Sequence, residues 1–149
     1  AGFNLNRRNP FDSIIRNPFP YSLSKDELSA RIDIPALLPG INFFAPPGKY
    51  AVYGLVASMG ILPDIFYTTH GYKPPATYQN AAPATQRTAW YPLLKGSPAT
   101  GLELNLPAAA PDIAFSLILS IGICFGVMSG TDEPDQVKYA GAAKILAMA

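Results

Sequence analysis

The sequence predicts a mainly α-helical membrane protein with extensive irregular structure, and three observations support this fold class. Residues 113–130 (IAFSLILSIGICFGVMSG) carry no charge over eighteen residues, enough for a helix to cross the apolar part of a bilayer. Charged residues make up only 14% of the chain, whereas typical soluble domains have about 25%. The 16 prolines and 12 glycines interrupt a chain that is nonetheless 49% hydrophobic. This combination favours a protein that lies against, and passes through, other apolar material.

Residues 1–49 are predicted to form an N-terminal arm that docks on a partner. The tripeptide Asn-Pro-Phe occurs twice in this arm, and each Asn-Pro pair favours an extended or turn conformation. The rings that follow, Phe11 and Phe19, are therefore candidate partner-docking residues, because large aromatic side chains often anchor interfaces. A terminal coil that repeats a common tripeptide by chance is the alternative.

A short helix is predicted near residues 25–33. Ser24 and Glu27 have the spacing of a capping box, in which each side chain bonds to the backbone N–H of the other residue. The apolar run at residues 34–45 is too short and too often broken by proline and glycine to span a membrane. We expect this run to lie at a membrane interface or in a groove of a partner, where Phe43 and Phe44 would be buried. A hydrophobic loop in a soluble core is the alternative.

Residues 50–70 form the next segment, in which a second, kinked transmembrane helix is predicted over about 50–69. Tyrosine and phenylalanine stand at both ends, as in the aromatic belts of spanning helices. Gly54 and Ser58 form a small-xxx-small pair that lets another helix approach closely. Because a Pro-Asp pair interrupts the pattern, an amphipathic helix outside the membrane is the alternative.

The only histidine of the chain, His70, follows this second helix and is a candidate chlorophyll ligand. A neutral imidazole is a common metal ligand, and it can supply the one axial ligand that the magnesium of a chlorophyll needs. An ordinary histidine at a helix end is the alternative. Chlorophyll, carotenoid or lipid is expected against the apolar faces of the helices.

Two segments are predicted to lie outside the spanning helices. Residues 71–111 are rich in proline and have no sustained helical or strand periodicity, so they are expected to run as an extended strap over a partner. Trp90 and Tyr91 are the candidate docking residues of this strap. Residues 131–149 are predicted to form a C-terminal tail with a short helix.

The main transmembrane helix is predicted within residues 112–130. Gly122, Gly126 and Gly130 recur every four residues, which places them on one face of a helix. Without side chains on that face, another helix, a lipid tail or a pigment can approach the backbone. A buried helix in a soluble domain is the alternative interpretation of the whole segment.

The residue inventory argues against several chemistries. The net charge of the chain is +1 and the basic residues are scattered along it, so nucleic acid binding is not expected. The single cysteine and single histidine favour neither a metal site nor a disulfide within the chain. No phosphate-binding loop or catalytic triad can be assembled from the motifs present. We therefore expect no catalytic residues and no enzyme activity.

These observations predict a non-catalytic accessory subunit of a large organellar membrane complex. Such a subunit would stabilise assembly, bridge neighbouring membrane subunits and contact lipids. A photosystem or antenna supercomplex in the thylakoid is favoured. A subunit of a mitochondrial respiratory complex or ATP synthase, in the inner membrane, is the first alternative. A small soluble binding domain with residues 113–130 as its core helix is the second alternative.

Overall fold

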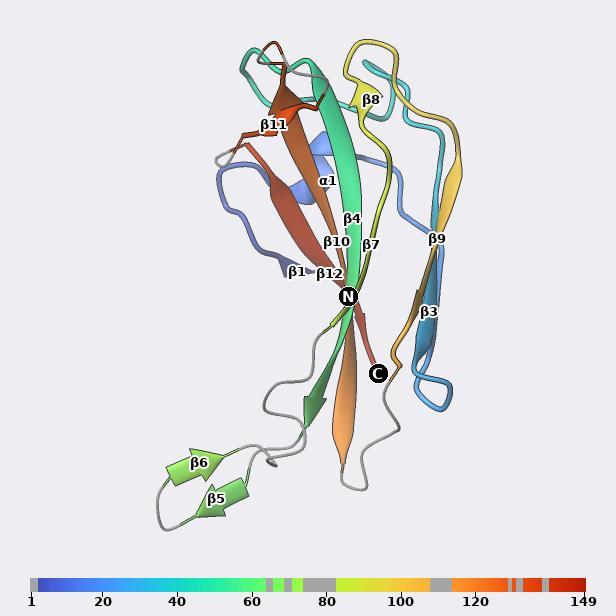
Figure 1. Ribbon diagram of the computed structural model, residues 1–149, viewed down its shortest axis with the longest axis vertical. Helices are drawn as coiled ribbons and strands as arrows, with labels where there is room; N and C mark the ends of the chain where they lie inside the picture. The colour runs from blue at the N-terminus through green and yellow to red at the C-terminus, as the bar shows by residue number, and fades with distance from the viewer. Residues whose placement is uncertain are drawn as a thin grey trace.

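The computed structural model is built from β-strands (Figure 1). It describes residues 3–63, 66–68, 71–73, 83–107, 114–128, 130, 133–137 and 140–149. In this part of the chain the one helix, α1 (Phe11–Ile14), is a single turn, and a membrane-spanning helix is not found. The prediction of a mainly α-helical membrane protein is therefore wrong. The prediction of an integral thylakoid or mitochondrial membrane protein depended on spanning helices and is overturned with them.

Seven strands form one large sheet, which curls into an open half-barrel, and three strands form a small sheet beside it (Figure 1). The strand pairs described are antiparallel. The large sheet runs in the order β1 (Phe3–Asn4), β12 (Ala142–Met148), β10 (Phe115–Val127), β4 (Val52–Pro63) and β7 (Ala84–Arg87), with β11 (Asp135–Gln136) on β10 and β8 (Tyr91–Pro92) on β4. The small sheet consists of β2 (Tyr21–Ser24), β3 (Ser29–Ile34) and β9 (Thr100–Asn105), and β5 (Phe66–Thr68) with β6 (Gly71–Lys73) forms a separate hairpin.

The two segments predicted as transmembrane helices are the central strand pair of the large sheet. β4 and β10 pair without a break from Val52 opposite Gly126 to Pro63 opposite Phe115. Along β10, the large side chains of alternate residues are fully buried, as Leu119 and Ile121 are. The residues between them are mainly serine, glycine and cysteine, which are uncharged. The strand therefore alternates in side-chain size rather than in polarity, and an uncharged run of this kind resembles a spanning helix.

The predicted glycine face of a helix is part of a strand face instead. A spacing of four residues also returns to the same side of a strand, where side chains alternate with period two. Gly122 and Gly126 lie on the outer face of β10. A Cβ atom at these positions would lie 3.3 Å from Val56 Cγ1 and 3.0 Å from Val52 Cγ2, respectively, so neighbouring side chains of this chain fill the space. Gly130 has a φ of +83° in the connection after β10, a conformation that favours glycine.

Both sheets contribute to one hydrophobic core. Inward-facing residues of the small sheet, such as Ile32 and Leu104, are as completely buried as those of β10. α1 also contributes Phe11 and Ile14 to this core. Burying large aliphatic side chains contributes about 1.5–3 kcal/mol each, so this shared core is the main stabilising feature of the fold.

The predicted short helices are also corrected. Glu27 N–H donates to Ser24 Oγ at 3.3 Å, which is half of the expected capping box. This bond closes the turn between β2 and β3, where Leu28 has a φ of +49°, and the chain continues as a strand instead of a helix over 25–33. The described part of the C-terminal tail, 131–149, forms β11 and β12 in place of a helix.

Candidate functional site

The predicted docking residues lie within this chain's own fold. Phe11 and Phe19 are buried and meet edge-to-face, with ring centroids 5.7 Å apart. Tyr91 lies in β8, with its ring centroid 5.9 Å from that of Tyr53. Trp90 is half-buried, and its Cε3 lies 3.6 Å from the place a Cβ would take on Gly54. The four aromatic residues predicted as partner anchors therefore pack against their own chain.

The predicted strap is likewise part of the fold wherever residues 71–111 are described. β7 and β8 pair with β4, and β9 pairs with β3. His70, the candidate chlorophyll ligand, lies outside the described residues. Gly54 and Ser58, predicted to receive a second helix, lie on the outer face of β4 and pair with Cys124 and Ser120 of β10.

Cys124 lies on the outer face of β10, opposite Gly54 of β4, and is buried there. Its Sγ–H donates to the carbonyl oxygen of Gly54 at 3.4 Å, and burial raises the pKa of the thiol above its usual value. A buried thiol with a raised pKa is a poor nucleophile, because the thiolate is the reactive form. These features argue for a structural role of this side chain.

Alkylation of the native protein by iodoacetamide near pH 8 is expected to be at least about tenfold slower than in denaturant, because Cys124 is buried and protonated. The chain has one cysteine, so the mass of the adduct reports on this site alone. Equal labelling rates in native and denaturing buffer would contradict the buried position.

The raised pKa of the Cys124 thiol in the folded protein also makes stability depend on pH. It contributes stability that is present below the unfolded thiol pKa of about 8.5 and is lost as the pH rises through the folded value.

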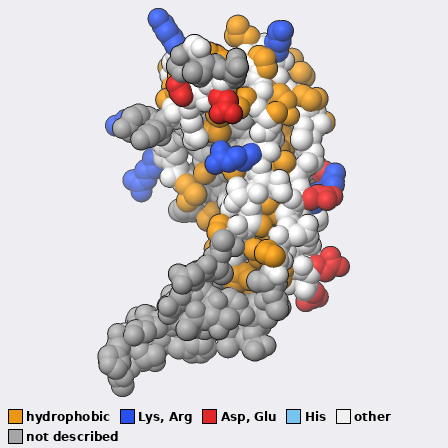
Figure 2. Space-filling view, viewed as in Figure 1, with side chains coloured by type: hydrophobic (Ala, Val, Ile, Leu, Met, Phe, Trp, Pro, Cys, Tyr) orange, Lys and Arg blue, Asp and Glu red, His pale blue; other side chains and the backbone are white. Residues whose placement is uncertain are grey.

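Three exposed aliphatic side chains lie on loop connections at one end of the molecule. Leu38, Ile41 and Leu94 are 47%, 72% and 90% exposed, and we call these three residues the apical patch. In Figure 2, orange side chains reach the surface at the top of the molecule, over the loops near β8, with blue side chains beside them. Single exposed leucines are ordinary, but three on adjoining turns mark a candidate interaction surface.

Backbone hydrogen bonds join the two turns that carry the apical patch. Leu37 and Ser97 exchange N–H···O bonds of 2.9 and 3.1 Å as an isolated antiparallel bridge. Gly96 has a φ of +73°, and a Cβ on it would collide with the carbonyl group of Leu37. Glycine is therefore required here both by the backbone conformation and by the close approach of the turns.

Buried polar side chains hold each turn in place. Asn42 Oδ1 accepts a 2.7 Å bond from Leu38 N–H, and Asn42 Nδ2 donates to the Ala36 carbonyl oxygen at 2.9 Å. On the second turn, Ser97 accepts a 2.6 Å bond from the Tyr53 hydroxyl group in the core. These bonds keep the turns in one conformation, so the exposed side chains are preorganised for binding.

The charges around the apical patch are positive. The connections at residues 35–50 and 92–99 contain Lys49 and Lys95 and no acidic residue. Arg16 belongs to the same surface, because its N–H donates to the Asn42 carbonyl oxygen and its guanidinium lies 4.2 Å from the Phe44 ring centroid. The acidic residues of β11 lie beyond β10, whereas β8 lies on the opposite side of the β4–β10 pair.

Sequence reasoning located this region but not its exposed residues. Residues 34–45 were expected to bury Phe43 and Phe44 in a membrane interface or a partner. Phe43 is instead buried in the chain's own core, with its ring centroid 4.5 Å from that of Tyr53. No local pattern distinguishes the aliphatic side chains that point outward from those that point inward. No sequence pattern indicated that Leu94, on a turn distant in the sequence, would belong to the same surface.

Comparison of the chain with protein-family models, characterised proteins and solved structures found no match.

Proposed function

We propose that this chain is a non-catalytic subunit of a protein assembly and docks through its apical patch into a partner protein. The partner surface has an apolar socket with an acidic rim. The observation that supports this most is the exposure of Leu38, Ile41 and Leu94 on turns that are rigidly held by the core. Lys49, Lys95 and Arg16 supply the positive charge that such a rim would match.

Burial of the apical patch in a partner protein is favoured over its exposure to water. Burying an exposed leucine or isoleucine contributes about 1.5–3 kcal/mol. A flexible loop would lose part of this gain in ordering, whereas turns that are already hydrogen-bonded lose little. Flanking cations accelerate association with an acidic partner and select against basic surfaces.

The test compares binding by the natural chain, an Ile41→Ser/Leu94→Ser variant and a Leu62→Ser/Met148→Ser control variant. The control residues are 50% and 63% exposed but lie at the far end of β4 and on β12. Proteins that bind each chain are recovered from source-cell extract and ranked by how much less the patch variant recovers than the natural chain does. The protein with the largest loss is purified, and its binding to each chain is measured by titration. We expect about 100-fold weaker binding for the patch variant, from about 3 kcal/mol of lost burial, and less than about threefold for the control.

Electrostatics supply a second readout of the same proposal. Lys95→Glu is expected to slow association, and raising the salt concentration is expected to slow association of the natural chain. Equal recovery of every protein by the patch variant would overturn the proposal. A dimer of the natural chain in sedimentation that the patch variant abolishes would overturn it too, because the occupant would then be a second copy of this chain.

A further inference from the structure

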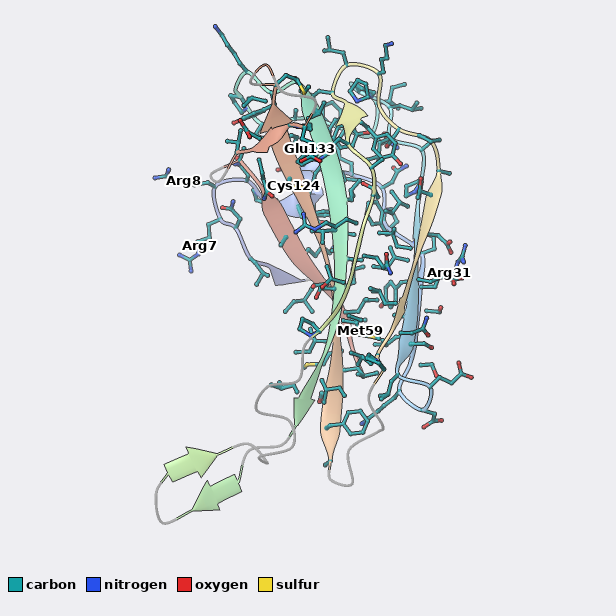
Figure 3. The ribbon with its side chains drawn as sticks, in the orientation of Figure 1. Arg7, Arg8, Arg31, Met59, Cys124 and Glu133 are labelled. Carbon is teal, nitrogen blue, oxygen red and sulfur yellow. The ribbon has the colours of Figure 1, made fainter. Side chains whose placement is uncertain are left out.

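A cleft of about 340 Å³ lies on the outer face of the small sheet, near the turn that joins β2 to β3. Figure 3 shows Arg31 at this face, pointing away from the large sheet, and Figure 2 shows blue and red side chains together along the same edge. The cleft is separate from the apical patch, because none of its lining residues belongs to the turns at residues 35–50 or 92–99.

The strand register arranges six polar side chains of the cleft as two parallel rows. Residues directly opposite each other on paired strands project from the same face, and strands are about 4.8 Å apart. The rows are Ser22–Arg31–Glu103 and Ser24–Ser29–Asn105. Serine side chains are short, so they form the floor, while longer side chains and the turn residue Glu27 form the walls.

Arg31 forms one wall and is held in place by two carboxylates. Its Nε donates to Asp33 at 3.0 Å and its Nη1 donates to Glu103 at 2.6 Å. The guanidinium group lies over Gly101, where a Cβ would come within 2.6 Å of Nη2. A side chain at position 101 would push the guanidinium away, so the glycine permits this orientation. The fixed guanidinium still has donors that can meet a ligand.

Several polar groups in the cleft have no partner within the described part of the chain. The side chains of Ser22, Ser29 and Asn105 make no hydrogen bond there, although they line one cavity. Hydroxyl groups both donate and accept, and the amide of asparagine does the same through separate atoms. The cleft therefore offers closely spaced donors and acceptors from three strands.

The balance of charge decides which ligand class fits. Asp33 and Glu103 pair with the single guanidinium of Arg31, and Glu27 adds a further carboxylate to the cleft, so an anionic ligand is disfavoured. An apolar ligand would leave the polar groups unpaired. Sugar hydroxyls both donate and accept hydrogen bonds, as the serine hydroxyls of the cleft do. We propose that this cleft binds a neutral carbohydrate, one or two sugar units in length.

The test is a titration followed by amide NMR and calorimetry. The probes are disaccharides of glucose, galactose, mannose, xylose and N-acetylglucosamine. At least one is expected to shift the amide signals of β2, β3 and β9, with a Kd in the range of about 0.1–1 mM. Ser29→Leu fills the floor of the cleft and is expected to weaken binding at least about tenfold. Thr85→Leu, a matched change on exposed β7, is expected to leave binding unchanged.

Three results would overturn the carbohydrate site. These are the absence of shifts on β2, β3 and β9 with every sugar, equal binding by Ser29→Leu, and shifts produced by chloride or calcium salts but by no sugar. Asn105→Leu, on the edge strand β9, serves as a second cleft variant if Ser29→Leu disturbs folding as judged by circular dichroism. Neither variant touches the apical patch, so loss of sugar binding and loss of protein docking are distinguishable.

Discussion

Replacing Leu119 with alanine is expected to lower the free energy of unfolding by about 2–5 kcal/mol, whereas Ile118→Ala is expected to cost about 1 kcal/mol. Leu119 is fully buried between the sheets, and its neighbour Ile118 lies on the outer face of the same strand. Both changes remove a branched aliphatic side chain, so each variant controls for the other. Urea unfolding followed by circular dichroism measures the difference.

Extending the comparison along β10 distinguishes a strand from the helix expected from the sequence. Alanine at Leu117, Leu119 and Ile121 is expected to be costly at each step of two residues, because all three face the core. Substitution at Ser116 and Ser120 is expected to have little effect. A pattern of costs that repeats every three to four residues would contradict the strand.

Phe43→Ala is expected to lower the free energy of unfolding by about 3–5 kcal/mol, compared with about 1–2 kcal/mol for Phe44→Ala. Phe43 is buried against Tyr53 and joins the first turn of the apical patch to the core. Phe44 is only half-buried, and its ring packs under the exposed guanidinium of Arg16. Thermal unfolding monitored by near-ultraviolet circular dichroism gives both values.

The same pair of variants connects stability with docking. We expect Phe43→Ala to weaken partner binding even at temperatures where the protein remains folded. The variant loosens the first turn, so Leu38 and Ile41 lose their fixed positions. Equal stability of the two variants would contradict the burial of Phe43. Such a result would favour the sequence-based expectation, in which both rings bury in a partner.

Local hydrogen-bond chemistry was partly predictable from the sequence, although the elements were not. The bond between Ser24 and Glu27 forms as the spacing predicts, yet it closes a hairpin turn instead of starting a helix. Serine and threonine hydroxyls accept backbone N–H bonds in turns and at helix starts alike. Whether this bond starts a helix or closes a hairpin therefore depends on the pairing of the residues that follow it. Those residues form β3, which pairs with β9, a strand about seventy residues later.

The candidate sites, like the strands of the fold, could not be predicted from the sequence. The cleft depends on the register that sets Ser29 beside Asn105, and the apical patch depends on the bridge between Leu37 and Ser97. Each joins residues that are far apart in the sequence. A single sequence shows the residue types but not the pairing that brings them to one surface.

By itself, the sequence determined that residues 113–130 and the start of the 50–69 segment are uncharged, apolar and long enough to require a nonpolar environment. Tertiary structure decided that each segment is largely covered by its own chain, as β10 and β4 of one sheet. Hydrophobicity indicates that water is excluded but not what excludes it. A helix satisfies its backbone hydrogen bonds locally, whereas a strand needs a distant partner, so only the pairing of Ile121 with Ala57 and its neighbours distinguishes the two.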